Sequence, residues 1–187
     1  MPGKQTANQK FIQQAAPSYL NALVAVNAFE QEIQNRCKKV LVTHLPALEK
    51  AMKLKLNPLK VEFHPTWDKW KELDPDFSAS LSASLELNDP RGEFRRLYSG
   101  LDWESDGSVY ASTTFELRTS KFTDLLFEKL DGKIQKFSDP QKGYYLYACE
   151  DVPLDRADVF EDKLEETLRV WAKAWSTAGG LSAVFKK

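Results

Sequence analysis

The segment FSASLSASLEL, residues 77–87, constrains the fold more than any other part of this sequence. Apolar side chains occupy its odd positions, and small polar side chains or glutamate occupy its even positions. Because successive side chains of a β-strand point to opposite faces of a sheet, this alternation predicts a strand with one buried and one polar face. Serine fills the polar positions 78, 80, 82 and 84. The sequence therefore predicts a sheet whose outer face is small and rich in hydroxyl groups.

The next two strands are predicted on either side of the loop Ser-Asp-Gly that ends at Gly107. A three-residue loop with Gly107 in the left-handed conformation pairs Trp103 with Val109, which puts the apolar side chains of both strands on one face. A two-residue turn would put them on opposite faces. The three-residue loop also places Arg96 opposite Glu116 on the polar face, where a cross-strand charge pair is favourable. We therefore predict a bulged hairpin.

Apolar residues that recur every three or four positions predict helices on both sides of the strands. The first helix begins near Ser18, and its stripe of Leu23, Val26, Phe29 and further residues as far as Met52 is expected to be buried. Proline removes a helical hydrogen bond and clashes with the preceding turn, so Pro46 predicts either a kink or a break with a second helix after it.

The predicted fold is an α+β domain, a mostly antiparallel sheet of about five strands with long N- and C-terminal helices packed on one face. Residues 1–17 are expected to form a flexible N-terminal arm, and residues 18–187 a single domain. Helices are predicted over residues 18–52, 120–137 and 155–176, and strands over residues 59–64, 77–87, 93–104, 108–118 and 143–152.

The composition excludes several classes of protein. Lys and Arg number 26 against 27 Asp and Glu, so the molecule has no net charge that would favour nucleic acid or a membrane surface. Two cysteines, Cys37 and Cys149, stand far apart and give neither a disulfide framework nor zinc-ligand spacing, which fits a reducing compartment. The N-terminal residues have no signal-peptide pattern, and no run of 18 apolar residues occurs. We expect a cytoplasmic protein without a cofactor.

The polar sheet face is the candidate binding surface. Small hydroxyl-bearing side chains let another backbone or a ligand approach closely, and they offer donors and acceptors at little cost in side-chain entropy. Two alternatives remain open: the serines are merely solvated, or the first helix or the arm covers them. The register is expected to put Leu81 opposite Ser99. The candidate binding residues are Ser80, Ser82, Ser84, Arg96, Tyr98, Tyr110, Ser112 and Thr114.

Charge is unevenly distributed along the two long helices. Residues 35–60 hold seven basic residues and one acidic residue, Glu49, whereas residues 150–166 hold eight acidic residues against Arg156 and Lys163. The simpler interpretation is that the first and last helices lie side by side and attract each other. The alternative is a bipolar surface that docks a partner or a second copy.

A catalytic alternative rests on Asp102 or Asp106, followed by Glu116 and Arg118. An acid on one hairpin strand and Glu-x-Arg on the next resembles the pattern of the PD-(D/E)XK nucleases, whose acids hold a divalent metal and whose lysine positions the attacking water. Arginine stands here in place of that lysine, and the Pro-Asp pair is absent. The two histidines, His44 and His64, and the two cysteines predict no metal site and no nucleophile.

The sequence therefore predicts a non-catalytic protein-binding module of the immunity-protein, effector-chaperone or adaptor type, acting through the serine-rich face and the charged helices. Its partner is expected to be another protein, with a homodimer as an open alternative. The alternatives are the nuclease-like enzyme and a small-ligand site in a cavity beneath the sheet, lined by Tyr98 and Tyr110.

Overall fold

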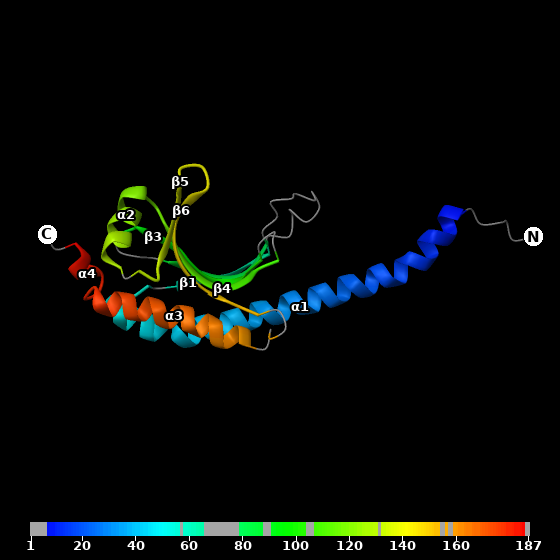
Figure 1. Cartoon of the computed structure of the whole chain (residues 1–187), viewed down its shortest axis with the longest axis horizontal. Helices are drawn as coiled ribbons and strands as arrows, with labels where there is room; N and C mark the ends of the chain where they lie inside the picture. Colours follow the sequence, from blue (N-terminus) through cyan, green and yellow to red (C-terminus); the bar gives the residue numbers. More distant parts are fainter. Residues whose placement is uncertain are drawn as a thin grey trace, which may run out of the picture. The chain divides into compact units, whose positions relative to one another are not determined.

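A computed structural model of the chain (Figure 1) describes residues 7–56, 58–65, 79–87, 91–103, 107–130, 132–153, 156 and 159–185. Side chains are described in these ranges except at residues 7–9, 12, 58–65 and 79. The chain divides into two compact units, Met1–Glu32 and Ile33–Lys187. None of the described helices is both long enough and apolar enough to cross a membrane.

The described elements are helices and antiparallel strands. In chain order they are α1 (Ala7–Met52), β1 (Pro58–Pro65), β2 (Ala79–Leu87), β3 (Phe94–Trp103), β4 (Val109–Leu117), α2 (Ser120–Lys129), β5 (Gln135–Asp139), β6 (Gly143–Asp151), α3 (Phe160–Thr177) and α4 (Leu181–Val184). The strands form one antiparallel sheet in the order β1-β2-β3-β4-β6-β5. The predicted α+β class is confirmed, and the described sheet has six strands where about five were expected.

Except at the start of β3, where Phe94 is buried and Arg95 exposed, the odd-numbered side chains of β2, β3 and β4 form the buried face of the sheet, as their alternation predicts. Leu81, Leu97 and Phe115 are fully buried there, and they belong to one core with the C-terminal part of α1 and with α3. Cys37 Sγ lies 3.9 Å from the Leu81 carbonyl oxygen, and Trp171 Nε1 donates to the Thr113 carbonyl oxygen at 2.9 Å. The C-terminal part of α1 and α3 therefore pack on this face (Figure 1). The polar side chains of these strands point the other way.

The register of the β3–β4 hairpin is the predicted one. Trp103 pairs with Val109 and Arg96 with Glu116, and Gly107 has a φ of +88°, in the left-handed region. The pairing shifts by one residue between Phe94 and Arg96, a β-bulge that the sequence did not predict.

The predicted register between β2 and β3 is wrong by two residues. Leu81 lies opposite Leu101, not Ser99, and Ser80 consequently lies opposite Asp102. A shift of two residues leaves every side chain on the same face, so the alternation of apolar and polar residues could not distinguish the two registers.

Helix α1 begins at Ala7, so the described part of the expected arm, residues 7–17, is helical. The helix also continues through Pro46 without a break. The predicted burial of the whole stripe is wrong for its first half, because Leu23, Val26 and Phe29 are each more than 40 % exposed. Burial begins at Ile33, where the second compact unit begins.

The predicted helix over residues 120–137 ends early. Helix α2 ends at Lys129, and its C-cap residue Leu130 is extended, with φ −92° and ψ 146°. The chain then enters β5, which pairs with β6, so Phe137 lies on a strand and is exposed instead of belonging to a helical stripe. Thr119 is the N-cap, as predicted, and its Oγ1 accepts from the Phe122 amide at 3.2 Å.

The charged helices attract each other, as the simpler interpretation predicts. Arg36 of α1 lies 3.2 Å from Glu161 of α3, and Lys39 lies 3.9 Å from the same carboxylate. One turn of α3 further on, His44 Nε2 lies 3.6 Å from Glu165. These charges are therefore engaged within the second unit.

Candidate functional site

The even-numbered side chains of β2, β3 and β4 meet those of β6 and β5 on the polar face. Four cross-strand rows define this face. They are Glu86–Arg96–Glu116–Tyr145–Phe137, Ser84–Tyr98–Thr114–Tyr147–Gln135, Ser82–Gly100–Ser112–Cys149 and Ser80–Asp102–Tyr110–Asp151. All eight predicted binding residues thus lie on one face. Those of β2 pair with residues of β3 two positions further along than expected.

The centre of this face is closed rather than open. Ser82 is 5 % exposed and Ser84 is fully buried, and Gly100 and Ser112 are buried beside them. At Gly100 a Cβ atom would lie only 2.6 Å from the Ser82 Cβ, so β2 and β3 approach here too closely for a larger side chain. The small serines therefore have a packing role, and their accessible neighbours form the surface that a partner would meet.

Asp102 lies among hydroxyl groups at one end of the face. Ser112 Oγ donates to its Oδ2, and Ser80 also hydrogen-bonds to the carboxylate. Burial raises the pKa of Asp102 above its ordinary value, and the two hydroxyl groups counteract only part of this rise. The contact with Ser80 could not be predicted from the sequence, because it depends on the register between β2 and β3.

Glu116 is the centre of a second cluster, nearer the other end. Arg95 Nη1 lies 2.8 Å from Glu116 Oε1, and the Tyr98 hydroxyl donates to Oε2 at 2.9 Å. The sequence predicted Arg96 as the ionic partner of Glu116. Arg96 is indeed its cross-strand neighbour and lies 3.5 Å from the Tyr98 hydroxyl, but the β-bulge brings the preceding Arg95 to the carboxylate. Burial raises the pKa of Tyr98 to about 12.

The rim of the face is aromatic. Tyr98, Tyr110, Tyr145 and Tyr147 are half-buried, and the Phe137 ring lies 6.0 Å from that of Tyr145. The tyrosines of β6 are not among the binding residues predicted from the sequence. The alternation in Gly-Tyr-Tyr-Leu-Tyr-Ala-Cys contained the signal, because Leu146 and Ala148 share a parity that leaves Tyr145 and Tyr147 on the other side.

The structure does not bring the nuclease-like residues together. Asp102 of β3 lies opposite Tyr110 of β4, and Glu116 lies six positions beyond Tyr110 on β4. At about 3.3 Å per residue, Asp102 and Glu116 are therefore about 20 Å apart. That spacing is too large for a shared divalent ion. Arg118 is exposed beyond the end of β4, and Asp106 lies outside the described residues. No group of three metal-ligating side chains occurs among the residues the structure describes.

The small-ligand site expected at Tyr98 and Tyr110 stays a prediction. Both side chains lie on the polar face, and Tyr98 pairs with Thr114, four positions from Tyr110 on β4. A cavity of about 230 Å³ lies elsewhere, at one edge of the sheet, and is lined in part by Lys133, Gln135 and Cys149. The Cys149 thiol accepts from Gln135 Nε2 at 3.3 Å, and burial raises its pKa.

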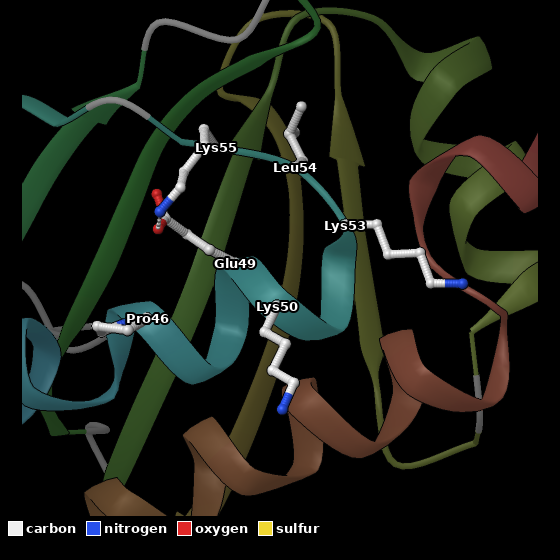
Figure 2. A pocket seen from close by; sticks show the side chains of 6 residues that line it. All are labelled: Pro46, Glu49, Lys50, Lys53, Leu54 and Lys55. Atoms are coloured by element: carbon white, nitrogen blue, oxygen red, sulfur yellow. Dashed lines mark hydrogen bonds and ion pairs between the residues drawn. The ribbon is translucent and has the colours of Figure 1, made fainter.

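A second cavity, of about 320 Å³, lies beside the C-terminal end of α1 (Figure 2). It is lined by Pro46, Glu49, Lys50, Lys53, Leu54 and Lys55. Figure 2 shows Lys55 turned toward Glu49, to which its Nζ donates at 2.8 Å, with Lys50 and Lys53 pointing away.

This cavity has a structural explanation. The Leu56 amide also donates to Glu49, at 2.9 Å. Burial acts to raise the pKa of Glu49, but the hydrogen bonds from Lys55 and Leu56 outweigh it and hold that pKa below its ordinary value. Lysines beside the last carbonyl groups of a helix are favourable in any case. The cluster therefore closes the turn that leads from α1 toward β1.

Cys37 and His44 have structural explanations. Cys37 is fully buried in the core, and burial raises the pKa of its thiol to about 12, so the reactive thiolate is suppressed. His44 pairs with Glu165, and the side chain of His64 lies outside the described residues.

No protein-family model, curated protein or solved structure matches this chain.

Proposed function

We propose that this chain is a non-catalytic protein-binding module of the immunity-protein, effector-chaperone or adaptor type. The docking surface is the aromatic and polar rim of the sheet face opposite α1 and α3. Its members are Ser80, Arg96, Tyr98, Tyr110, Thr114, Tyr145, Tyr147 and Phe137, and the buried Ser82, Ser84 and Ser112 support them from within.

The observation that carries the proposal is the set of half-buried tyrosines on this face, with Arg96 on the same face. Tyrosine and arginine are the side chains enriched at protein interfaces, where a large, rigid group with a polar end gains contact area at low entropic cost. Phe137 is 41 % exposed at the edge of the same face and adds apolar area that a partner would bury.

The charges of this face favour a protein over a nucleic acid. Its acids, Glu86, Asp102, Glu116 and Asp151, outnumber its bases, and a phosphate backbone requires a surplus of Lys and Arg. The charged faces of α1 and α3 are not part of this docking surface, because Arg36 and Lys39 of α1 form ion pairs with Glu161 of α3.

The test is affinity enrichment from a lysate of the source organism, with bound proteins quantified by mass spectrometry. Thr114→Lys places a long charged side chain in the middle of the docking surface. Ser176→Lys makes a similar change on the exposed side of α3 and is the control. We expect one protein to be retained by the wild type and by Ser176→Lys. Thr114→Lys should retain it on the order of tenfold less, because the interface would bury an unpaired charge.

Circular dichroism must show that both variants fold. A retained protein that is equally abundant on Thr114→Lys would place the binding surface elsewhere. Retention of nothing by the wild type, under conditions where the chain is folded, would contradict the function itself.

A further inference from the structure

The N-terminal unit has a concentration of exposed apolar side chains. Among the described residues between positions 11 and 26, large apolar side chains are 42–69 % exposed to solvent; they are Phe11, Tyr19, Leu20, Leu23, Val24 and Val26. Exposed contiguous apolar patches of this kind on a folded chain mark interaction sites.

The spacing on this segment of α1 is that of a helix that packs along another helix. Ala16, Tyr19, Leu23 and Val26 follow one another at intervals of three, four and three residues. Alternating intervals of three and four average 3.5 residues, the period that keeps one stripe facing a neighbouring helix. Leu20 and Val24 widen the stripe beyond a narrow seam, as in helices that pack in bundles.

The charges determine which neighbour fits. The 19 residues from Phe11 to Phe29 contain no charged side chain, whereas Lys10 precedes them and Glu30 follows them. A pair of parallel copies would set Lys10 against Lys10 and Glu30 against Glu30. A pair of antiparallel copies puts opposite charges together at both ends. It also aligns the two helix dipoles in opposite directions, which is favourable.

The antiparallel arrangement has a consistent register. If Tyr19 of one copy lies level with Leu23 of the other, then Ala16 lies level with Val26, so a small side chain faces a larger one. The two-fold axis makes each contact occur twice, as in other isologous dimers. We propose that two copies of this chain associate through the apolar stripe of residues 11–29 of α1, packed antiparallel about a two-fold axis at the level of position 21.

Other occupants fit less well. A charged partner would find no opposite charge along this segment. Helices that lie in a membrane surface carry lysine and arginine on their polar face, and this one carries glutamine, serine and asparagine there.

Sedimentation equilibrium of the full chain over a range of concentrations is the first test. We expect a reversible dimer for the wild type and for Asn21→Lys, whose side chain lies on the opposite side of the helix from the stripe. Leu23→Lys should be a monomer at the same concentrations. A wild type that stays monomeric at all concentrations would overturn the proposal, and so would a Leu23→Lys protein that still forms dimers. Binding of the monomer to lipid vesicles, without self-association, would also overturn it.

Disulfide cross-linking tests the direction, in a Cys149→Ser background because Cys149 is the half-buried free thiol. An equimolar mixture of Tyr19→Cys and Leu23→Cys chains should give mainly the mixed disulfide if the copies are antiparallel. Predominant homodisulfides of each variant alone would show a parallel pair and contradict the proposed arrangement. Because the sheet face is not involved, Leu23→Lys should retain the partner protein as the wild type does, which separates failure of this proposal from failure of the proposed function.

Discussion

At the scale of single residues, Gly100 is required by the close approach of two strands. A Cβ at this position would lie 2.6 Å from the Ser82 Cβ and 2.7 Å from its Cα, and backbone atoms cannot move aside as a flexible side chain can. Gly100→Ala is therefore expected to lower the free energy of unfolding by about 1–3 kcal/mol or more. At Gly132 a Cβ would have no heavy atom within 4 Å, so Gly132→Ala is the matched control and should be nearly neutral. Urea unfolding of both variants checks this, and equal losses would contradict the close approach.

Two buried tryptophans of α3 differ in their hydrogen bonding. Trp171 Nε1 donates to the Thr113 carbonyl oxygen, whereas Trp175 Nε1 has no acceptor among the described residues. Both side chains are fully buried. Trp171→Phe removes this hydrogen bond, at a cost of about 0.5–1.5 kcal/mol beyond the loss of volume, whereas Trp175→Phe removes an unsatisfied donor. We expect the first variant to be the less stable by about 1 kcal/mol in chemical unfolding. The reverse order would show that ring volume dominates.

Asp102 should make the stability depend on pH in the direction opposite to that of a carboxylate whose pKa is lowered by an ionic partner. Burial raises its pKa in the folded state, so the unfolded chain loses this proton first as the pH rises above the ordinary value of 3.8. In the window from there up to the folded-state pKa, the folded state binds more protons than the unfolded state, and stability falls with rising pH. Asp102→Asn removes this contribution.

The comparison of unfolding free energies at about pH 3 and about pH 7 tests this contribution. The free energy of unfolding of Asp102→Asn, measured relative to the wild type, should be higher at about pH 7 than at about pH 3. A relative loss over the same interval would mean that the hydrogen bonds from Ser80 and Ser112 stabilise the carboxylate more than burial disfavours it.

At the scale of elements, the start of α2 depends on a single cap. Thr119 Oγ1 accepts from the Phe122 amide, and the Thr119 carbonyl accepts from the Thr123 amide and hydroxyl. Thr119→Ala should cost about 1 kcal/mol, because an amide at the helix start loses its acceptor. Ser120→Ala, at the next and exposed position, should change the thermal midpoint little. Equal effects of the two variants would show that the cap hydrogen bond contributes nothing.

At the scale of the whole molecule, the described core begins at Ile33, which is also where the second unit begins. Deletion of residues 1–32 should therefore leave a cooperatively folding protein. Its thermal midpoint should stay within about 4 °C of that of the full chain at low concentration, since 1 kcal/mol corresponds to about 2–4 °C for a chain of this length. Calorimetry measures this. Loss of cooperative unfolding would show that the N-terminal helix is part of the folding core.

The sequence by itself determined the features for which local geometry allows only one arrangement. These are the pairing of side chains across the β3–β4 hairpin and the buried face of α3. The β3–β4 register followed from the three-residue loop and its left-handed glycine, and the buried stripe of α3 from Phe160 to Trp175 followed from the helical period. Both depend on local geometry, in which a shift of one residue would expose the apolar side chains.

Only the tertiary structure decided the features in which two local solutions are equally good. A shift by two residues preserves every face, so the alternation could not place Ser80 beside Asp102, and the β-bulge at Arg95 gave Glu116 its ionic partner. Likewise, an apolar stripe in the sequence does not state what covers it. Along α1 the same periodicity is buried after Ile33 and exposed before it, because burial depends on which elements the fold brings to each part of a helix.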